Sequence, residues 1–302
     1  MGHEGEGEGG GLTQMWIYLN DRFVPKEEAR ISVFDHGFLY GDGVFETLRA
    51  YRGKAFMLNE HLARLEKSAA RLQIPMPVKR SRLSAVVAES LEKNQLTEAY
   101  LRITVSRGPG EIGLEPALCR SPTFVVIANP FEPYPESFYT DGVSVAVVQT
   151  RRNLPEALPP QVKSLNYLNN ILAKMEATAL GAFEALLLNQ HGELTEGTTS
   201  NVFVSLGGRL LTPAQDCGIL AGITRNLVLQ LARELKIPAE ETRLTAADLA
   251  IADECFLTNT TVEVLPVTQV DGQRIGDGRP GEITRRLHAS FRDSLDRLLA
   301  GR

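Results

Sequence analysis

The sequence predicts an α/β protein of two domains with a crevice between them. In each half of the chain, strand-like stretches alternate with helix-like stretches. The segment NPFEPYPES (129–137), with three prolines in nine residues, separates the halves. A chain of 302 residues is long enough for two ordinary cores. We therefore expect a small domain over 15–130, a linker over 131–137 and a larger domain over 138–302.

The first half is expected to begin with strands and continue with two helices. Residues 1–14, MGHEGEGEGGGLTQ, are rich in Gly and Glu and predict a disordered tail. Residues 16–19 and 22–24 predict a hairpin, and further strands are expected at 31–34, 44–51, 99–106 and 123–128. One helix is expected to be capped by Asn59 and to bury Leu62, Leu65, Ala69 and Leu72, and a second to span 81–93.

The second half repeats this alternation. Strands are expected at 143–149, 184–189, 201–208, 209–213, 254–258 and 264–270, with helices from Ile223, at 246–250 and at the C-terminal end. The segment QVKSLNYLNNILAKMEA (161–177) predicts an amphipathic helix with Ser164 or Asn166 as its cap. Its stripe facing the core would be Leu168, Ile171, Leu172 and Met175.

Composition excludes several classes of function. The net charge is −5 and there are no basic runs, which argues against a nucleic-acid partner. No apolar run approaches the ~20 residues of a membrane span, and the first residues lack a signal-like apolar core. Three widely spaced cysteines argue against a disulfide framework or a Cys-rich metal site. A cytoplasmic enzyme without a metal fits these bounds.

Four stretches of the second half carry residues that make chemical sense together. Lys163 precedes the amphipathic helix, Glu196 lies in a polar segment between two strands, Gly222 opens a helix with Ile223 and Thr224, and Thr260 lies in a hydroxyl-rich turn. Alone, each has an ordinary structural explanation. Together they match pyridoxal phosphate, which needs a lysine amine, a partner for its pyridine nitrogen and a phosphate site such as a helix start.

Six motifs in order strengthen this interpretation: YGDGVFETLRAY, NEHLARL, VKSLNYLNNILAKMEA, LTEGTTSNVF, LAGITR and NTTVEVLPV. From Trp16 onward the chain resembles the class IV (fold type IV) pyridoxal-phosphate aminotransferases. The resemblance implies a small α/β domain, a larger pseudo-barrel domain and the cofactor at their interface. It also implies a homodimer, or a larger assembly of such dimers, in which the loop 108–113 reaches the partner's pocket.

The resemblance assigns roles residue by residue. It implies that Lys163 forms the Schiff base and shuttles the proton, and that Glu196 bonds the pyridine nitrogen. It implies that Tyr167 lies near the phenolic oxygen. The phosphate is expected to be held by Gly222, Ile223, Thr224, Thr260 and Arg64, with two parallel N–H groups of the arginine gripping it. Amino acids and 2-oxo acids would then react alternately, in a ping-pong cycle.

The choice of substrate is divided among members of the family. Tyr100 and Arg102 match a pair at the substrate carboxylates of branched-chain enzymes, and Tyr40, Phe45 and Thr261 match their substrate pocket. An arginine beside an apolar pocket suits both a branched side chain and 2-oxoglutarate. Arg107, in VSRGPG, instead matches the D-amino-acid aminotransferases and aminodeoxychorismate lyase. We expect an L-branched-chain aminotransferase, with the D-amino-acid enzyme and then the lyase as alternatives, and a non-catalytic binding module as the least favoured.

Overall fold

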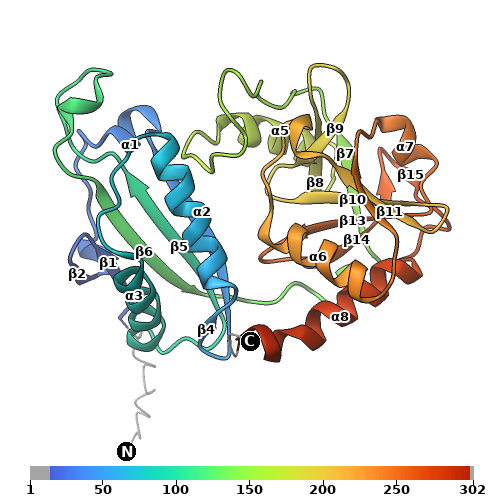
Figure 1. Cartoon of the computed structure of the whole chain (residues 1–302), viewed down its shortest axis with the longest axis horizontal. Coiled ribbons are helices and arrows are strands. Elements are labelled where there is room, and N and C mark those ends of the chain that lie inside the picture. Colours follow the sequence, from blue (N-terminus) through green and yellow to red (C-terminus); the bar gives the residue numbers. More distant parts are fainter. Residues whose placement is uncertain (1–13, 300–302) are drawn as a thin grey trace, which may run out of the picture.

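The computed structural model describes residues 14–299 and contains two sheets, one in each half of the chain (Figure 1). Residues 1–13 of the predicted tail lie outside the described residues, and Gln14 is exposed. The first sheet ends at Pro130, and Ser137 begins the first helix of the second half. Residues 131–136 therefore lead from the first sheet to α4 (Ser137–Thr140), and the predicted domain bounds stay a prediction.

The small domain is a six-stranded antiparallel sheet in the order β2-β1-β6-β5-β3-β4. Its strands are β1 (Trp16–Leu19), β2 (Arg22–Pro25), β3 (Gly43–Tyr51), β4 (Lys54–Ala55), β5 (Ala99–Ser106) and β6 (Thr123–Pro130). Its helices are α1 (His36–Tyr40), α2 (Leu58–Arg71) and α3 (Arg80–Lys93), with 3-10 turns at Lys26–Glu28 and Pro116–Leu118. Leucines of α2 and α3 pack with the sheet in one core.

Strand β3 is buried on both faces, although its sequence alternates. Val44, Leu48 and Ala50 enter the core beneath α2 and α3. Phe45 and Thr47 on the opposite face line a cavity toward the second sheet. A strand that lies between a helix layer and another domain is thus covered on both sides.

The large domain is built on a mixed nine-stranded sheet in the order β12-β11-β10-β13-β14-β7-β8-β9, with β15 on β14. Its strands are β7 (Val143–Val147), β8 (Glu184–Leu188), β9 (Leu194–Gly197), β10 (Asn201–Leu206), β11 (Arg209–Pro213), β12 (Ala239–Thr242), β13 (Glu254–Asn259), β14 (Glu263–Val270) and β15 (Gln273–Arg274). The end strand β9 also lies against β10 and β11, so the sheet curls back on itself. The expected pseudo-barrel is confirmed.

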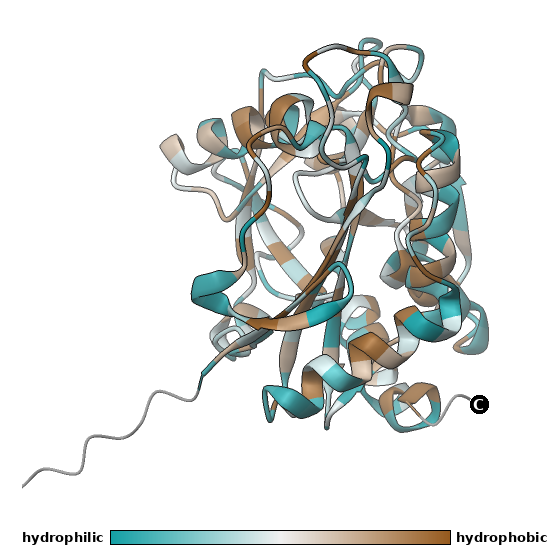
Figure 2. Cartoon of the chain, turned by 90° about the vertical axis from the view of Figure 1, so that its left-hand side faces the viewer, coloured by the Kyte–Doolittle hydropathy of each residue, from teal (hydrophilic) through white to brown (hydrophobic). Residues whose placement is uncertain are grey.

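Helices cover the curled sheet, and one of their cores reaches the small domain. They are α4 (Ser137–Thr140), α5 (Leu168–Ala179), α6 (Ile223–Glu234), α7 (Ala246–Ala250) and α8 (Glu282–Leu299), with a 3-10 turn at Gln215–Cys217. Figure 2 shows α-helices striped with hydrophilic and hydrophobic residues, as helices covering a sheet are expected to be. Tyr51 and Phe56 of the small domain pack with α6 and α8, and the Phe56 and Phe291 rings lie 5.5 Å apart.

The strand predicted at 31–34 is wrong. Ile31, Val33 and Phe34 are exposed and belong to no strand. The N–H of Phe34 donates to the Ser32 hydroxyl and the N–H of Asp35 donates to the Ser32 carbonyl. These local bonds form a turn, because serine offers the backbone an alternative to a ladder.

Two predicted helix starts are also wrong. Helix α2 begins at Leu58 after Met57, so Asn59 lies within its first turn and does not cap it. Helix α5 begins at Leu168 and has no side-chain cap, so neither Ser164 nor Asn166 caps it. Lys163 therefore lies five residues before the helix.

The apolar stripe of α5 does not face the core. Leu168, Ile171, Leu172 and Met175 are between 47% and 66% exposed. The buried face instead carries Asn170, Ala173 and Ala177, whose small side chains let the helix lie close to β7 and β8. The spacing correctly places these four residues on one face of α5. It does not show whether that face packs on the sheet or is exposed.

Within residues 14–299, no helix is both long and apolar enough to cross a membrane. The same residues contain no group of three or more His, Cys, Asp or Glu side chains placed to hold a metal ion.

Candidate active site

A cavity of about 400 Å³ lies between the two sheets and receives side chains from both. It is lined by predicted site residues from six parts of the chain: Phe45, Arg64, Tyr100, Arg102, Lys163, Tyr167, Gly222, Ile223, Thr224, Thr260 and Thr261. Thr47, Leu165, Thr199, Asn201, Leu220, Thr258 and Asn259 complete the lining. The candidate residues thus converge on one cavity, and their individual roles stay predictions.

Lys163 is fixed by the backbone of the small domain. Its carbonyl accepts from the Phe45 N–H at 3.0 Å, and the Leu165 N–H donates to the Gly43 carbonyl at 2.9 Å. Val162, immediately before it, packs in the core of the small domain. The segment around Lys163 therefore continues the edge of the small sheet and does not depend on α5 for its position.

The Lys163 amine points into an aromatic corner of the cavity. Its Nζ lies 3.4 Å from the Tyr167 hydroxyl and 4.7 Å from the centre of the Phe45 ring. The Phe45 and Tyr167 rings meet edge to face at 5.1 Å. An amine held between aromatic walls is pre-organised for attack on a carbonyl carbon.

Glu196 lies behind the cavity wall, in strand β9, and not in the polar turn expected from the sequence. Its Oε1 accepts from Arg152 Nε at 2.9 Å, and its Oε2 accepts from the Leu220 N–H at 2.9 Å and from the Asn201 amide at 3.3 Å. Burial raises the pKa of Glu196, while the charge of Arg152 and the Leu220 N–H oppose this shift. The carboxylate thus contacts two residues of the cavity wall.

The start of helix α6 has the donors that an anion site needs. Its N-cap, Gly222, has no side chain to bond the first turn, so the N–H groups of Ile223 and Thr224 have no intrahelical acceptor. A Cβ at Gly222 would lie 1.9 Å from Asn201 Oδ1, so a larger residue there would displace the Asn201 amide. The hydroxyl of Thr258, which also lines the cavity, is buried without a partner.

Arg64 reaches the same site from helix α2, but its fork is taken by Glu46. Nε and Nη2 donate to the two carboxylate oxygens at 2.7 and 2.8 Å, and Nη1 donates to the Ala221 carbonyl at 2.9 Å. Three of the five guanidinium N–H groups are therefore engaged, and two are left for an anion. Glu46 thus orients the guanidinium, and the predicted grip of two parallel N–H groups on the phosphate stays a prediction for the remaining pair.

Glu46 is the buried anchor of this arrangement. His61 Nδ1 lies 2.7 Å from its Oε2. Burial alone would raise the pKa of Glu46, but the hydrogen bonds and charge of Arg64, together with His61, lower it to about 2. Burial lowers the pKa of His61. Glu46 is thus ionised at neutral pH and keeps Arg64 in one orientation.

We expect Glu46→Gln to reduce the free energy of unfolding by about 3 kcal/mol at neutral pH, since it leaves Arg64 partly unpaired. The folded-state pKa lies below the ordinary value of 4.5, so the stabilisation is complete above that pH and is lost as pH falls toward 2. Urea unfolding between pH 7 and 3 checks this. Glu66→Gln, which breaks an exposed pair between α2 and Arg80 of α3, is the control and should cost less than about 1 kcal/mol.

The far side of the cavity carries one guanidinium above an aromatic ring. Arg102 lies 3.9 Å over the centre of the Phe45 ring. The Tyr100 hydroxyl lies 3.3 Å from the Thr47 hydroxyl, and Thr261 Oγ1 donates to Asn259 Oδ1. This wall offers a cation, hydroxyls and apolar surface within reach of Lys163.

Tyr40 and Arg107 do not line the cavity. Arg107 Nε donates to Asp42, and its Nη2 donates to the Leu72 carbonyl at 2.8 Å. The Tyr40 hydroxyl accepts from the Gly113 N–H. Neither side chain reaches the cavity of its own chain, so the structure gives no support to their predicted contacts with substrate. These contacts stay predictions.

Sequence reasoning missed Glu46, Arg152 and Asn201, each of which holds a predicted site residue in place. Glu46 had a usable signal, because it shares a strand face with Val44, Leu48 and Ala50, and an acid among such residues needs a buried partner. Arg152 had no such signal, because its partner Glu196 is 44 residues away in the sequence. Asn201 had none either, because Glu196 was expected in a polar turn and not beside it in a buried strand.

The residues present fit pyridoxal phosphate. The cavity offers an amine for a Schiff base and, for a phosphate, the unpaired first turn of α6, the two free N–H groups of Arg64 and the hydroxyls of Thr224, Thr258 and Thr260. Glu196 lies behind the wall formed by Leu220 and Asn201, where an acid can serve a ring nitrogen. When bound, the cofactor would supply an electron-withdrawing ring.

The family model described as "Amino-transferase class IV" matches residues 43–270 of the chain. A "Putative branched-chain-amino-acid aminotransferase" of Methanocaldococcus jannaschii is 47% identical over 92% of this chain and 96% of that protein. A D-alanine aminotransferase of Bacillus licheniformis is 37% identical over 93% of this chain and 97% of that protein.

Solved structures agree with these relatives. A branched-chain amino acid aminotransferase of T.th., solved with pyridoxamine 5'-phosphate, superposes with a TM-score of 0.90 at 33% identity. The alignment covers 93% of this chain and 94% of that chain. The likeness therefore extends over both sheets and the cavity between them.

Proposed function

This chain belongs to the class IV aminotransferase family of pyridoxal-phosphate enzymes, and from that premise we propose that it exchanges an amino group between L-branched-chain amino acids and 2-oxoglutarate. The observation that carries the proposal is the stacking of Arg102 on Phe45 in the cavity that holds the Lys163 amine. One wall then presents a cation for the second carboxylate of 2-oxoglutarate and an aromatic surface for a branched side chain.

Each half-reaction uses the same groups of the chain. The Lys163 amine would attach the cofactor and, once free, would take up and return the proton of the substrate carbon as general base and then general acid. Arg64, Ile223, Thr224 and Thr260 would hold the phosphate, and Glu196 would hold the pyridine nitrogen. The products of the two half-reactions leave in turn, which gives ping-pong kinetics.

Two alternatives share this cavity. The D-alanine aminotransferase relative favours D-amino acids as a second candidate. The resemblance also includes aminodeoxychorismate lyase, in which the same lysine would act as the base for loss of pyruvate. All three reactions need Lys163, so a Lys163 variant cannot distinguish them. The substrates that the enzyme accepts can.

We propose incubating the enzyme with 2-oxoglutarate and either L-leucine or D-alanine, or with pyruvate and D-glutamate, and measuring the new 2-oxo acid. Glutamate and the leucine-derived 2-oxo acid are the expected products. Turnover restricted to D-amino acids would select the second candidate. Release of pyruvate and 4-aminobenzoate from aminodeoxychorismate would select the lyase.

We expect Arg102→Gln to raise KM for 2-oxoglutarate about 10- to 100-fold, because a charge-assisted hydrogen bond to the second carboxylate is worth roughly 1.5–3 kcal/mol. KM for L-leucine should change less than about threefold. Arg71→Gln, at an exposed position on α2, is the control and should leave both values unchanged. Equal effects on both substrates would assign Arg102 to the shared α-carboxylate and remove its role in selecting 2-oxoglutarate.

We also propose that the chain works as a homodimer or an assembly of dimers, as its resemblance implies. Large apolar side chains are exposed on the small-domain segments and on α5, among them Phe38, Ile112, Leu114, Leu168 and Met175. Clusters of exposed apolar side chains are typical of surfaces that a partner covers. Sedimentation equilibrium of the wild-type enzyme tests this, and a monomer at micromolar concentration would contradict it.

A further inference from the structure

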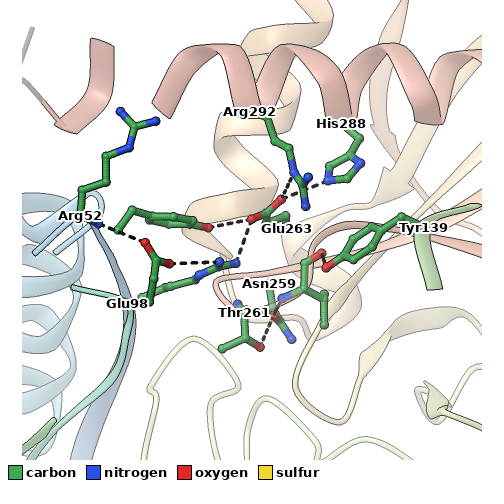
Figure 3. A network of polar contacts seen from close by, with 11 residues as sticks. Arg52, Glu98, Tyr139, Asn259, Thr261, Glu263, His288 and Arg292 are labelled. Carbon is green, nitrogen blue, oxygen red and sulfur yellow. Dashed lines mark hydrogen bonds and ion pairs between the residues drawn. The ribbon is translucent and has the colours of Figure 1, made fainter. Parts of the chain in front are cut away.

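We propose that Glu263 is a positioning residue for the cofactor phosphate, because its carboxylate ties the small domain to the turn that contains Thr260. Figure 3 shows the contacts of this carboxylate with His288 and Arg292. The residues proposed to hold the phosphate come from both domains: Arg64 from α2, and Thr224 and Thr260 from the large domain. They can bind one anion together only if the two domains keep fixed positions relative to each other. The inference rests on the proposed phosphate site.

Glu263 lies at the end of the turn in question. Strands β13 and β14 form a hairpin in which Asn259 pairs with Glu263, so residues 260–262 are its loop. Asn259 Oδ1 accepts from the Thr261 N–H at 2.8 Å, the Thr261 hydroxyl at 2.9 Å and the Val262 N–H at 2.8 Å. The loop is thus tied together from within, and its orientation depends on the two strand residues that close it.

The backbone of Glu263 is unusual for a residue with a side chain. Its φ of +59° lies in the left-handed region, where glycine is the residue without steric cost. Hairpins with three-residue loops often use such a position, and glycine is commonly found there. A glutamate kept in this conformation indicates that its carboxylate contributes enough to offset the strain.

The carboxylate is bound from both domains. Arg49 Nη1 donates at 2.8 Å and the Tyr51 hydroxyl at 3.0 Å, both from β3 of the small domain. His288 Nε2 lies at 3.0 Å and Arg292 Nε donates at 3.0 Å, both from α8 of the large domain. Glu263 itself is 1% exposed. A buried carboxylate with four such partners is a rigid junction.

Positively charged neighbours keep the Glu263 carboxylate ionised. Burial alone would raise the pKa of Glu263, but hydrogen bonds from His288 and Arg292 and the charges of Arg292 and Arg49 lower it to about 2. Arg49 is itself confined, with its guanidinium carbon 4.1 Å from the Tyr51 ring centre and 4.3 Å from that of Phe131. Arg49 also pairs with Glu98 at 3.4 Å.

Strand β3 connects the junction to the other half of the phosphate site. Three residues before Arg49, the same strand carries Glu46, which orients Arg64. Beyond the junction, Glu263 closes the loop that presents Thr260. One strand and one carboxylate therefore link the arginine of the small domain to the threonine of the large domain.

The test compares Glu263→Gln and Glu263→Gly by binding of pyridoxal phosphate and of pyridoxal to the apoenzyme, followed by absorbance. Glutamine keeps the size without the charge, and glycine removes the backbone strain together with the carboxylate. We expect both variants to raise Kd for pyridoxal phosphate about tenfold or more. Kd for pyridoxal, which has no phosphate, should change less than about threefold, as should kcat at saturating cofactor.

Glu254→Gln is the matched control. The Glu254 carboxylate accepts from the Ile283 and Thr284 N–H groups and the Thr284 hydroxyl, so it fastens the start of α8 without touching the turn. It should lower Tm and leave Kd for pyridoxal phosphate unchanged. If the Glu263 variants do not fold, Tyr51→Phe removes one hydrogen bond to Glu263 and should raise that Kd about threefold.

The inference is overturned if both Glu263 variants bind pyridoxal phosphate within twofold of wild type, or if Glu254→Gln weakens binding as much as they do. If Glu263→Gly binds pyridoxal phosphate with wild-type affinity, only the backbone conformation at this position matters and the carboxylate does not. That result would also overturn the inference. Arg64→Ala separates this failure from failure of the proposed site. If Arg64→Ala weakens pyridoxal phosphate but not pyridoxal, the site stands whatever the Glu263 variants do.

Discussion

Lys163→Ala is expected to lower the transamination rate by at least about a thousandfold, because it removes both the Schiff-base amine and the group that moves the proton. The backbone around Lys163 is held by Gly43 and Phe45, so the substitution should leave the fold intact. The absorbance of a lysine Schiff base, about 410–430 nm, should disappear while pyridoxal phosphate still binds through its phosphate.

Lys174→Ala is the control for this substitution. Lys174 lies on α5, eleven residues further along the chain, and its exposed amine donates to the Phe183 carbonyl. Activity and absorbance should both stay at wild-type values. Retention of the absorbance band in Lys163→Ala would mean that another lysine binds the cofactor.

Glu196→Gln is expected to lower kcat about a hundredfold or more, since a neutral amide cannot keep a proton on the pyridine nitrogen as a carboxylate does. The amide oxygen can still accept from the Leu220 N–H, so the cavity wall should keep its shape. A fall in kcat would then result from the lost negative charge of Glu196 and not from a change in the shape of the cavity. Stopped-flow absorbance of the half-reaction with L-leucine measures the step directly.

Glu193→Gln is the matched substitution for Glu196→Gln. Glu193 lies three residues earlier and pairs with the exposed Arg243, away from the cavity. It should leave kcat within about twofold, as expected for a surface ion pair. A Glu196→Gln enzyme with kcat within threefold of wild type would show that Glu196 does not act on the nitrogen.

Much of the fold could be predicted because periodicity reports which face of an element is apolar. The two halves, the strand β3 and the buried leucines of α2 follow from that signal. Periodicity does not say what covers a face. The apolar stripe of α5 is therefore exposed in one chain, and its alanine face packs on the sheet.

The candidate site was predictable only where residue type and motif agreed. Lys163, Thr224 and Thr260 line the cavity as expected. Their supports were not predictable, because Arg152 meets Glu196 and Arg49 meets Glu263 across distances of 44 and 214 residues in the sequence. Such pairs are defined by tertiary packing, and local sequence carries no record of them.

The lysine that binds the cofactor can be identified directly. Borohydride reduction of the enzyme with bound pyridoxal phosphate converts the Schiff base to a stable secondary amine, and peptide mass spectrometry then locates it. The modification is expected on Lys163 and on no other lysine. Modification of a different lysine, or none in an enzyme that transaminates L-leucine, would contradict the role proposed for Lys163.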